Sequence, residues 1–212
     1  WQDTLGRLGI DANTRVVVYG EDLREVARVW WILRYWGVKD ARLLNGGWAA
    51  WQAAGGETAR GEEKEPAFKP IDRPELKPQP GRLATRDNVL DLIKKGQEQI
   101  IDSRSPAEFS GDRKMAKRGG TIPGSVHLEW SDLIDRKTQR FKRAEELTKL
   151  FKEAGIDPDK PATTFCQSGG RAAVMAFGLE LMGGKGVRNY YRSWAEWGNQ
   201  DDTPVVTPKP KK

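Results

Sequence analysis

The sequence predicts an α/β protein with two related domains, each a largely parallel sheet flanked by helices. Short apolar segments alternate with helix-like segments, which is the pattern of parallel sheets. An internal repeat divides the chain into two copies of one fold. The single cysteine, Cys166, lies in a loop that follows a strand and opens a helix, and α/β proteins bind ligands at such strand ends.

Local signals place each element along the chain. In the first copy, a helix leads into a strand at residues 15–19. In the second copy, Thr85 is a good N-cap and Ser105 begins a capping turn with Pro106 at the first helical position. Gly155 ends the helix that precedes the cysteine strand. The expected helices of the second copy are 86–95, 144–154 and 172–182, and the expected strands are 99–102, 126–128 and 161–165.

The repeat relates the two copies by an offset of 146 residues without a gap. A register kept over about 45 residues indicates a duplicated domain. The first copy has Gly20 where the second has Cys166, so only the second copy can use a thiol. The aligned residues include Gly9 with Gly155, Leu33 with Leu179, Gly37 with Gly183, Arg42 with Arg188, Trp48 with Trp194, and Trp51 with Trp197.

One part of the second copy has no counterpart in the first. It spans residues 84 to about 147, so the repeat predicts that the first domain lacks roughly its first 60 residues. A half domain buries too little surface for a normal core. We therefore expect that the chain is a fragment, or that a separate segment or chain completes the first domain. The predicted boundaries are 1–56 for the first copy, 57–81 for a proline-rich linker, 82–204 for the second copy, and 205–212 for a basic tail.

The cysteine loop has the character of a site for a sulfur anion. Glycines in such a loop allow successive backbone N–H groups to point inward, and the helix N-terminus adds partial positive charge. Arg171 adds a full charge at the end of the loop. Because these surroundings favour a thiolate, Cys166 is predicted to be a nucleophile rather than a buried structural residue. The loop residues after it are Gln167, Ser168, Gly169, Gly170 and Arg171.

Several motifs together resemble the ordered signatures of the rhodanese family. They are residues 102–109, residues 120–125, the cysteine loop, and Ser193-Trp194-Ala195-Glu196-Trp197-Gly198. The tandem repeat with a cysteine only in the second copy is similar to the two-domain thiosulfate sulfurtransferases. The resemblance implies tandem rhodanese-like domains, of which the first is inactive, N-terminally incomplete and packed against the active one. It also implies a Cys166 persulfide that carries sulfur from thiosulfate to cyanide or a thiol.

The resemblance further implies roles for individual residues. The loop residues 167–171 would bind the substrate with their backbone amides, and Arg118 would belong to a cationic rim that steers anions. Asp102 and Arg104 would form a buried pair that supports the loop. Family members that use 3-mercaptopyruvate carry an arginine where this chain has Glu108, so Glu108 favours thiosulfate as the donor.

Other functions remain open at this stage. One alternative is a 3-mercaptopyruvate sulfurtransferase, and a second is a non-enzymatic sulfur carrier or interaction module. Phosphatases of the same fold use a loop of seven residues from cysteine to arginine, whereas Cys166 to Arg171 spans only six. A cysteine–histidine protease dyad is disfavoured, because the sole histidine, His127, is expected to be structural.

The composition sets the expected partners. The net charge of +6 suits small anions, namely a sulfur donor and a thiophilic acceptor, without requiring nucleic acid. We expect no metal, no cofactor, no nucleic acid and no membrane as partners, since the sequence has no zinc spacing and no apolar run of transmembrane length. The cytoplasm is the favoured compartment, and the periplasm stays open because the true N-terminus is expected to be absent.

Overall fold

The computed structural model describes residues 1–61 and 68–208, and all structural statements concern these residues. They separate into two compact units. The first unit contains the described residues up to Pro80 together with residues 138–140, and the second contains the rest. In both units parallel strands are flanked by helices, so the predicted α/β fold class is confirmed.

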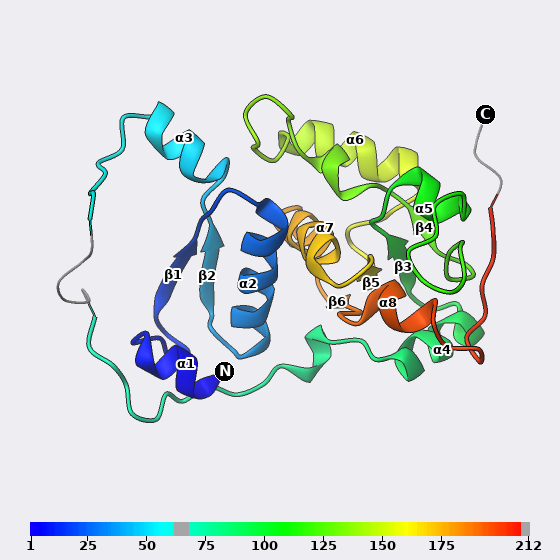
Figure 1. Cartoon of the computed structure of the whole chain (residues 1–212), viewed down its shortest axis with the longest axis horizontal. Coiled ribbons are helices and arrows are strands. Elements are labelled where there is room, and N and C mark those ends of the chain that lie inside the picture. The colour runs from blue at the N-terminus through cyan, green and yellow to red at the C-terminus, as the bar shows by residue number, and fades with distance from the viewer. Residues whose placement is uncertain (62–67, 209–212) are drawn as a thin grey trace. The chain divides into compact units, whose positions relative to one another are not determined.

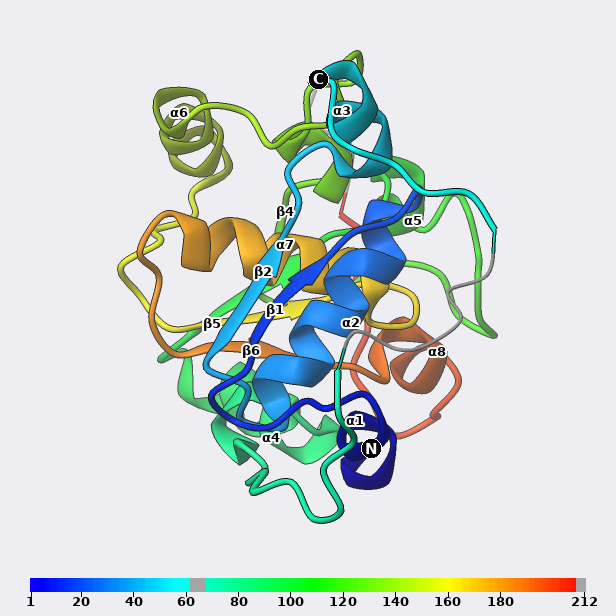
Figure 2. The same ribbon diagram turned by 90° about the vertical axis from the view of Figure 1, so that its left-hand side faces the viewer.

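The first unit is built on a two-stranded parallel sheet. Strands β1 (Arg15–Val18) and β2 (Asp40–Leu43) pair along their whole length. Helix α2 (Leu23–Tyr35) connects them and packs on both (Figure 2). Asp22 caps α2 by accepting the N–H of Arg24. Two short helices, α1 (Gln2–Arg7) and α3 (Gly47–Ala53), lie before β1 and after β2 in the chain.

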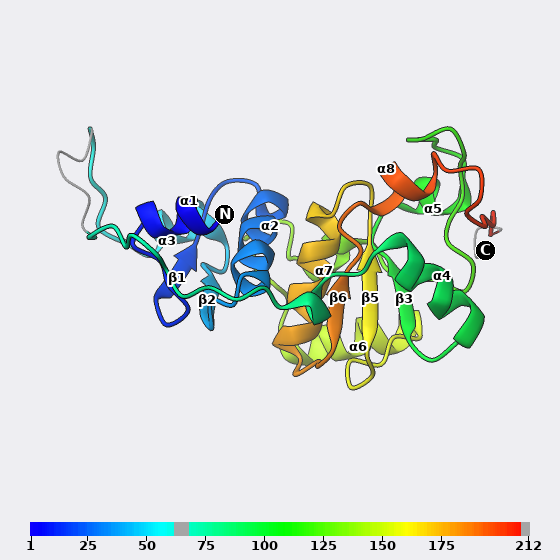
Figure 3. The same cartoon turned by 90° about the horizontal axis from the view of Figure 1, so that it is seen from below.

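The second unit contains a four-stranded parallel sheet in the order β4-β3-β5-β6 (Figure 1), and Figure 3 shows β3, β5 and β6 side by side. Its strands are β3 (Gln99–Asp102), β4 (Val126–His127), β5 (Ala162–Phe165) and β6 (Val187–Asn189). Its α-helices are α4 (Arg86–Lys95), α5 (Pro106–Ser110), α6 (Ala144–Ala154), α7 (Gly170–Leu181) and α8 (Ser193–Trp197), and its 3-10 helices are η1 (Pro80–Arg82, which begins at the boundary between the units) and η2 (Trp130–Leu133).

The repeat found in the sequence is also a repeat of structure. Strand β1 pairs with β2 in the same register as β5 with β6, since Val17 faces Arg42 and Thr163 faces Arg188. Helices α2 and α7 follow the first strand of each pair, and α3 and α8 follow the second. The expected N-cap of α4 is present, because Thr85 accepts the N–H of Asn88. Helix α7 begins two residues before the expected position, at Gly170.

Two predicted boundaries differ from the contacts in the structure. Residues 68–80 of the expected linker pack on the first unit: Leu76 is buried in its core, and Ile71 donates its N–H to Gly6. Residues 205–208 of the expected tail belong to the second unit, because Val206 forms backbone hydrogen bonds with Thr121. Both segments carry apolar side chains. Burying these side chains against a folded unit is more favourable than leaving them in water. The remaining parts, residues 62–67 and 209–212, lie outside the described residues.

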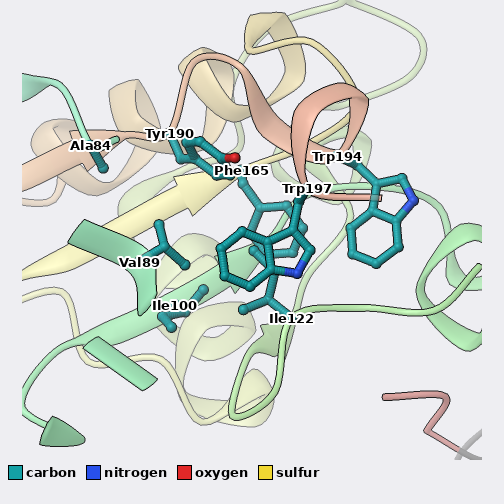
Figure 4. Close-up of a cluster of buried hydrophobic side chains, with 8 residues drawn as sticks. All are labelled: Ala84, Val89, Ile100, Ile122, Phe165, Tyr190, Trp194 and Trp197. Atoms are coloured by element: carbon teal, nitrogen blue, oxygen red, sulfur yellow. The ribbon is translucent and has the colours of Figure 1, made fainter. Parts of the chain in front are cut away.

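One apolar cluster of the second unit is shared between the repeated and the unrepeated part of the chain. Figure 4 shows its eight side chains. Four lie in the part without a counterpart, namely Ala84, Val89, Ile100 and Ile122. The other four are Phe165, Tyr190, Trp194 and Trp197.

In the first unit, the residues that match the repeated half of this cluster line an open pocket. They are Tyr19, Leu44, Trp48 and Trp51. Tyr19 is 58% exposed and Trp51 is 40% exposed, whereas Phe165 and Trp197 are fully buried. The first unit therefore exposes aromatic side chains at positions that are buried in the second unit.

The matched tryptophans provide a test of this difference. Trp197→Ala should lower the free energy of unfolding by about 3–5 kcal/mol, because it leaves a cavity in a closed cluster. Trp51→Ala should cost less than about 1 kcal/mol, because Trp51 is already in contact with solvent. Urea unfolding followed by circular dichroism measures both. Equal losses would show that the two positions are equally buried in solution.

Candidate active site

Cys166 occupies the position that the sequence predicts. It follows β5 directly, and α7 begins four residues later. The side chain is 1% exposed, and its Sγ accepts the backbone N–H of Gly169 at 3.1 Å. The backbone N–H of Cys166 donates to Ser193 Oγ at 3.1 Å. The thiol is therefore enclosed by its own loop, with an N–H group already directed at the sulfur.

Gly169 is required by the shape of this loop. Its φ of +88° lies in the left-handed region that side chains rarely adopt. A Cβ there would also lie 2.8 Å from the carbonyl oxygen of Tyr191. The tight turn leads directly into α7, so the N-terminus of this helix, with its partial positive charge, lies at the end of the cysteine loop.

Arg171 and Glu108 form a two-pronged ion pair at the end of the loop. Nη1 of Arg171 lies 2.7 Å from Oε2 of Glu108, and Nη2 lies 2.8 Å from Oε1. Glu108 is 3% exposed and also accepts hydrogen bonds from the backbone N–H and the Oγ of Ser105. The sequence analysis considered Glu108 only as a negative charge that disfavours a keto-acid donor. The structure instead shows its charge neutralised by Arg171.

This pairing controls the ionisation of Glu108. Burial alone would raise the pKa of its carboxyl, but the hydrogen bonds and charge of Arg171, with the contacts from Ser105, lower the pKa from 4.5 to about 2. The pKa of Arg171 is raised: burial opposes the rise, and Glu108 and the nearby Cys166 outweigh it. Both groups are therefore charged at neutral pH.

The other loop residues fall into two groups. Gln167 is half-buried and donates Nε2 to the carbonyl of Met115 at 3.1 Å, whereas Ser168 is exposed. Gly169 and Gly170 are buried at the start of α7. Substrate binding by these five residues stays a prediction, and the charge of Arg171 is already paired with Glu108.

Arg118 differs from its predicted role in a cationic rim. Its guanidinium donates to the carbonyls of Thr203 at 2.6 Å and Trp197 at 2.8 Å, and also to that of Gln200. These contacts fix the chain after α8. A guanidinium has several N–H donors, and here backbone carbonyls accept the hydrogen bonds that Arg118 would otherwise offer to an anion. Arg113, Lys114 and Lys117 of the same loop are exposed.

Asp102 and Arg104 form the buried pair that the sequence predicts. Both side chains are at most 1% exposed, and Nη2 of Arg104 lies 2.6 Å from Oδ2 of Asp102. The same guanidinium lies over the ring of Trp194, 4.3 Å from its centroid. His127 contacts the carbonyl of Arg104 at 2.8 Å and packs on Phe109, so its contacts are structural.

Asn189 was missed in the sequence, and Ser193 was recognised there only as part of the motif 193–198, without a role at the cysteine loop. Ser193 accepts the N–H of Cys166, and Asn189 donates to the carbonyl of Gly169. Neither side chain is charged. The repeat carried a signal for them, because the inactive copy has Gly47 and Leu43 at the matching positions. Within the described ranges, no group of three or more potential metal ligands is found, and no helix is long and apolar enough to span a bilayer.

Comparison with known proteins identifies the family. The family model of the rhodanese-like domain matches residues 1–54 and 85–200. The chain belongs to the rhodanese family. Its predicted enzyme class, a rhodanese-type sulfurtransferase, is confirmed by curated relatives named thiosulfate sulfurtransferase.

Two curated relatives and one solved structure are similar to this chain over most of its length. A thiosulfate sulfurtransferase of Corynebacterium glutamicum is 34% identical over 97% of this chain and 70% of its own length. A sulfur carrier protein of Thermus thermophilus is 35% identical over 94% of this chain and 73% of its own length. A variant of EanB in complex with ergothioneine has a TM-score of 0.87 at 25% identity, and this rhodanese chain spans 55% of its length.

The Glu108–Arg171 pair predicts a specific acid sensitivity. The folded-state pKa of Glu108, about 2, lies below its usual 4.5, so its stabilising effect is complete above about pH 4.5 and is lost as the pH falls towards 2. Glu108→Gln should cost on the order of 2–3 kcal/mol near neutral pH and much less in acid. Urea unfolding of both proteins at several pH values measures this. A difference in the free energy of unfolding between the two proteins that does not change with pH would contradict the assigned ionisation of Glu108.

Proposed function

We propose that this rhodanese transfers sulfane sulfur from thiosulfate to a thiophilic acceptor through a persulfide on Cys166. The observation that carries the proposal is the enclosure of the Sγ of a sole cysteine by a six-residue loop whose Gly169 N–H already donates to it. Such a loop stabilises a sulfur anion with fixed N–H dipoles rather than with a base.

In the first step, the Cys166 thiolate attacks the outer sulfur of thiosulfate. A bond forms between Sγ and that sulfur, the sulfur–sulfur bond of thiosulfate breaks with its electron pair, and sulfite leaves. The negative charge of the thiolate passes to the terminal sulfur of the persulfide. The buried position of Sγ favours this donor, because its reactive sulfur is a single terminal atom that can enter the loop.

In the second step, cyanide or a thiolate attacks the terminal sulfur. A new bond forms between the acceptor and that sulfur, the bond to Sγ breaks, and Cys166 returns as a thiolate. With cyanide the product is thiocyanate. No proton transfer to a side chain is needed, which agrees with the structural contacts of His127.

A sulfur-carrier function is the second candidate. It is supported by the resemblance to the Thermus thermophilus protein, whose name describes a sulfur carrier. A carrier would form the same persulfide but deliver it to a protein acceptor. Steady production of thiocyanate from thiosulfate and cyanide favours the enzyme, whereas one stoichiometric loading without turnover favours the carrier.

Sulfur loading is the direct test. Incubation of the reduced protein with thiosulfate should increase its intact mass by one sulfur atom, and cyanide should remove that atom. Cys166→Ser is the matched control and should stay unmodified, because a hydroxyl does not retain sulfane sulfur. An unchanged mass for the folded wild-type protein would refute the proposal.

Donor choice gives a further prediction. Thiosulfate should exceed 3-mercaptopyruvate in kcat/KM by about tenfold or more, equivalent to about 1.4 kcal/mol. The reason is that Arg171, the cation of the loop, is already bound to Glu108 and does not offer its fork to a substrate carboxylate. Initial rates measured with each donor give the two kcat/KM values to be compared. Preference for mercaptopyruvate would overturn the donor assignment while leaving the Cys166 mechanism in place.

A further inference from the structure

The cysteine loop is held from outside by hydrogen bonds to its carbonyl groups. The carbonyl of Cys166 accepts the N–H of Trp194 at 3.0 Å, and that of Gln167 accepts the N–H of Ala195 at 2.9 Å. The carbonyl of Gly169 accepts Nδ2 of Asn189 at 3.0 Å. Donors from β6 and α8 therefore fix the direction of three peptide groups in the loop.

The direction of these carbonyls determines where the loop N–H groups point. In a planar trans peptide the C=O and the following N–H point in opposite directions, and the described chain has no cis peptide bond. Carbonyls drawn towards β6 and α8 thus turn the N–H groups of Gln167, Ser168 and Gly170 away from β6 and α8. The remaining N–H group of this stretch, that of Gly169, donates to Sγ of Cys166.

We propose that Asn189 and Ser193 are positioning residues that orient these amides for the sulfur of Cys166, an inference that rests on the proposed function. Asn189 acts on the Gly169–Gly170 peptide. Ser193 acts at the other end of the loop, where its Oγ accepts the N–H of Cys166 at 3.1 Å and donates to the carbonyl of Tyr190 at 2.6 Å.

Ser193 adopts a backbone conformation that is unfavourable for serine. Its φ is +54°, in the left-handed region, which costs roughly 1 kcal/mol or more for a residue with a Cβ. The matching residue of the first repeat, Gly47, has a φ of +58°, so the turn itself needs only glycine. Serine at this position is explained by its hydroxyl contacts to the cysteine loop.

Asn189 also carries a buried polar atom that lowers the stability of the folded state. It is fully buried, and its Oδ1 has no hydrogen-bond partner among the described residues. A buried acceptor left in this way costs about 1–3 kcal/mol. The matching residue of the first repeat is Leu43, which has no polar atom to satisfy. The repeat that lacks the cysteine thus also lacks both positioning side chains.

The repeat supplies the variants for the test. Asn189→Leu and Ser193→Gly each introduce the residue of the first repeat, and glycine at position 193 also relieves the positive φ. Val187→Ala is the matched control, because Val187 is a buried residue of β6 without a hydrogen bond to the cysteine loop. The reporter reaction is alkylation of Cys166 by iodoacetamide as a function of pH, with melting curves for all proteins.

In both loop variants, the rate of Cys166 alkylation at neutral pH should fall about tenfold, because fewer oriented dipoles stabilise the thiolate. Thiocyanate formation should lose about tenfold in kcat with little change in KM, because neither side chain contacts the donor. Val187→Ala should keep the wild-type alkylation profile even if its melting temperature falls.

Overlapping alkylation profiles for folded Ser193→Gly and wild type would overturn the proposal. If Asn189→Leu does not fold, Ser193→Gly alone decides, because glycine at position 193 relieves the unfavourable positive φ. Alkylation needs no sulfur donor, so this result stands apart from the proposed function. A wild-type protein that thiosulfate does not load would refute the sulfurtransferase proposal, and the alkylation comparison would still test how the loop is positioned.

Discussion

The second unit depends on the buried ion pair between Asp102 and Arg104. Removing two charges from water is costly, and such a pair is stable only when its remaining hydrogen-bonding groups are satisfied. Here Arg104 also donates to the carbonyl of Gly120, and Asp102 accepts the hydroxyl of Thr121. The guanidinium in turn supports the ring of Trp194, whose backbone N–H holds the carbonyl of Cys166. The pair thereby joins β3, the loop before β4, and the start of α8 to the cysteine loop.

The two repeats separate what the fold requires from what the chemistry requires. Both have the same strand register and the same left-handed turn before the last helix, so these features belong to the fold. Cys166 and Ser193 occur only in the second repeat, where the first has Gly20 and Gly47. Their spacing along the chain is the same as that of the glycines. The fold therefore accommodates a loop of this shape whether or not the loop carries a thiol.

Local features were predictable from the sequence, and long-range partners were not. The N-cap of α4 at Thr85 and the strand–loop–helix around Cys166 depend on neighbouring residues, and both match the structure. The partner of Glu108 is 63 residues away in the chain, and those of Arg118 are about 80 residues away. Long charged side chains can reach many groups, so composition and spacing alone do not select one. The docking of residues 68–80 on the first unit was missed for the same reason.

The charge balance around the loop matters for turnover. A persulfide must be stable enough to form and labile enough to react, and an intermediate bound too tightly slows the next step. Because Glu108 neutralises Arg171, the pair adds little net charge beside the sulfur. The N–H dipoles of the loop then supply most of the stabilisation, and their strength is set by orientation. In the proposed reaction the persulfide stays because it is covalently bound to Cys166, whereas sulfite is free to leave, so the loop amides need only stabilise one negative charge on sulfur.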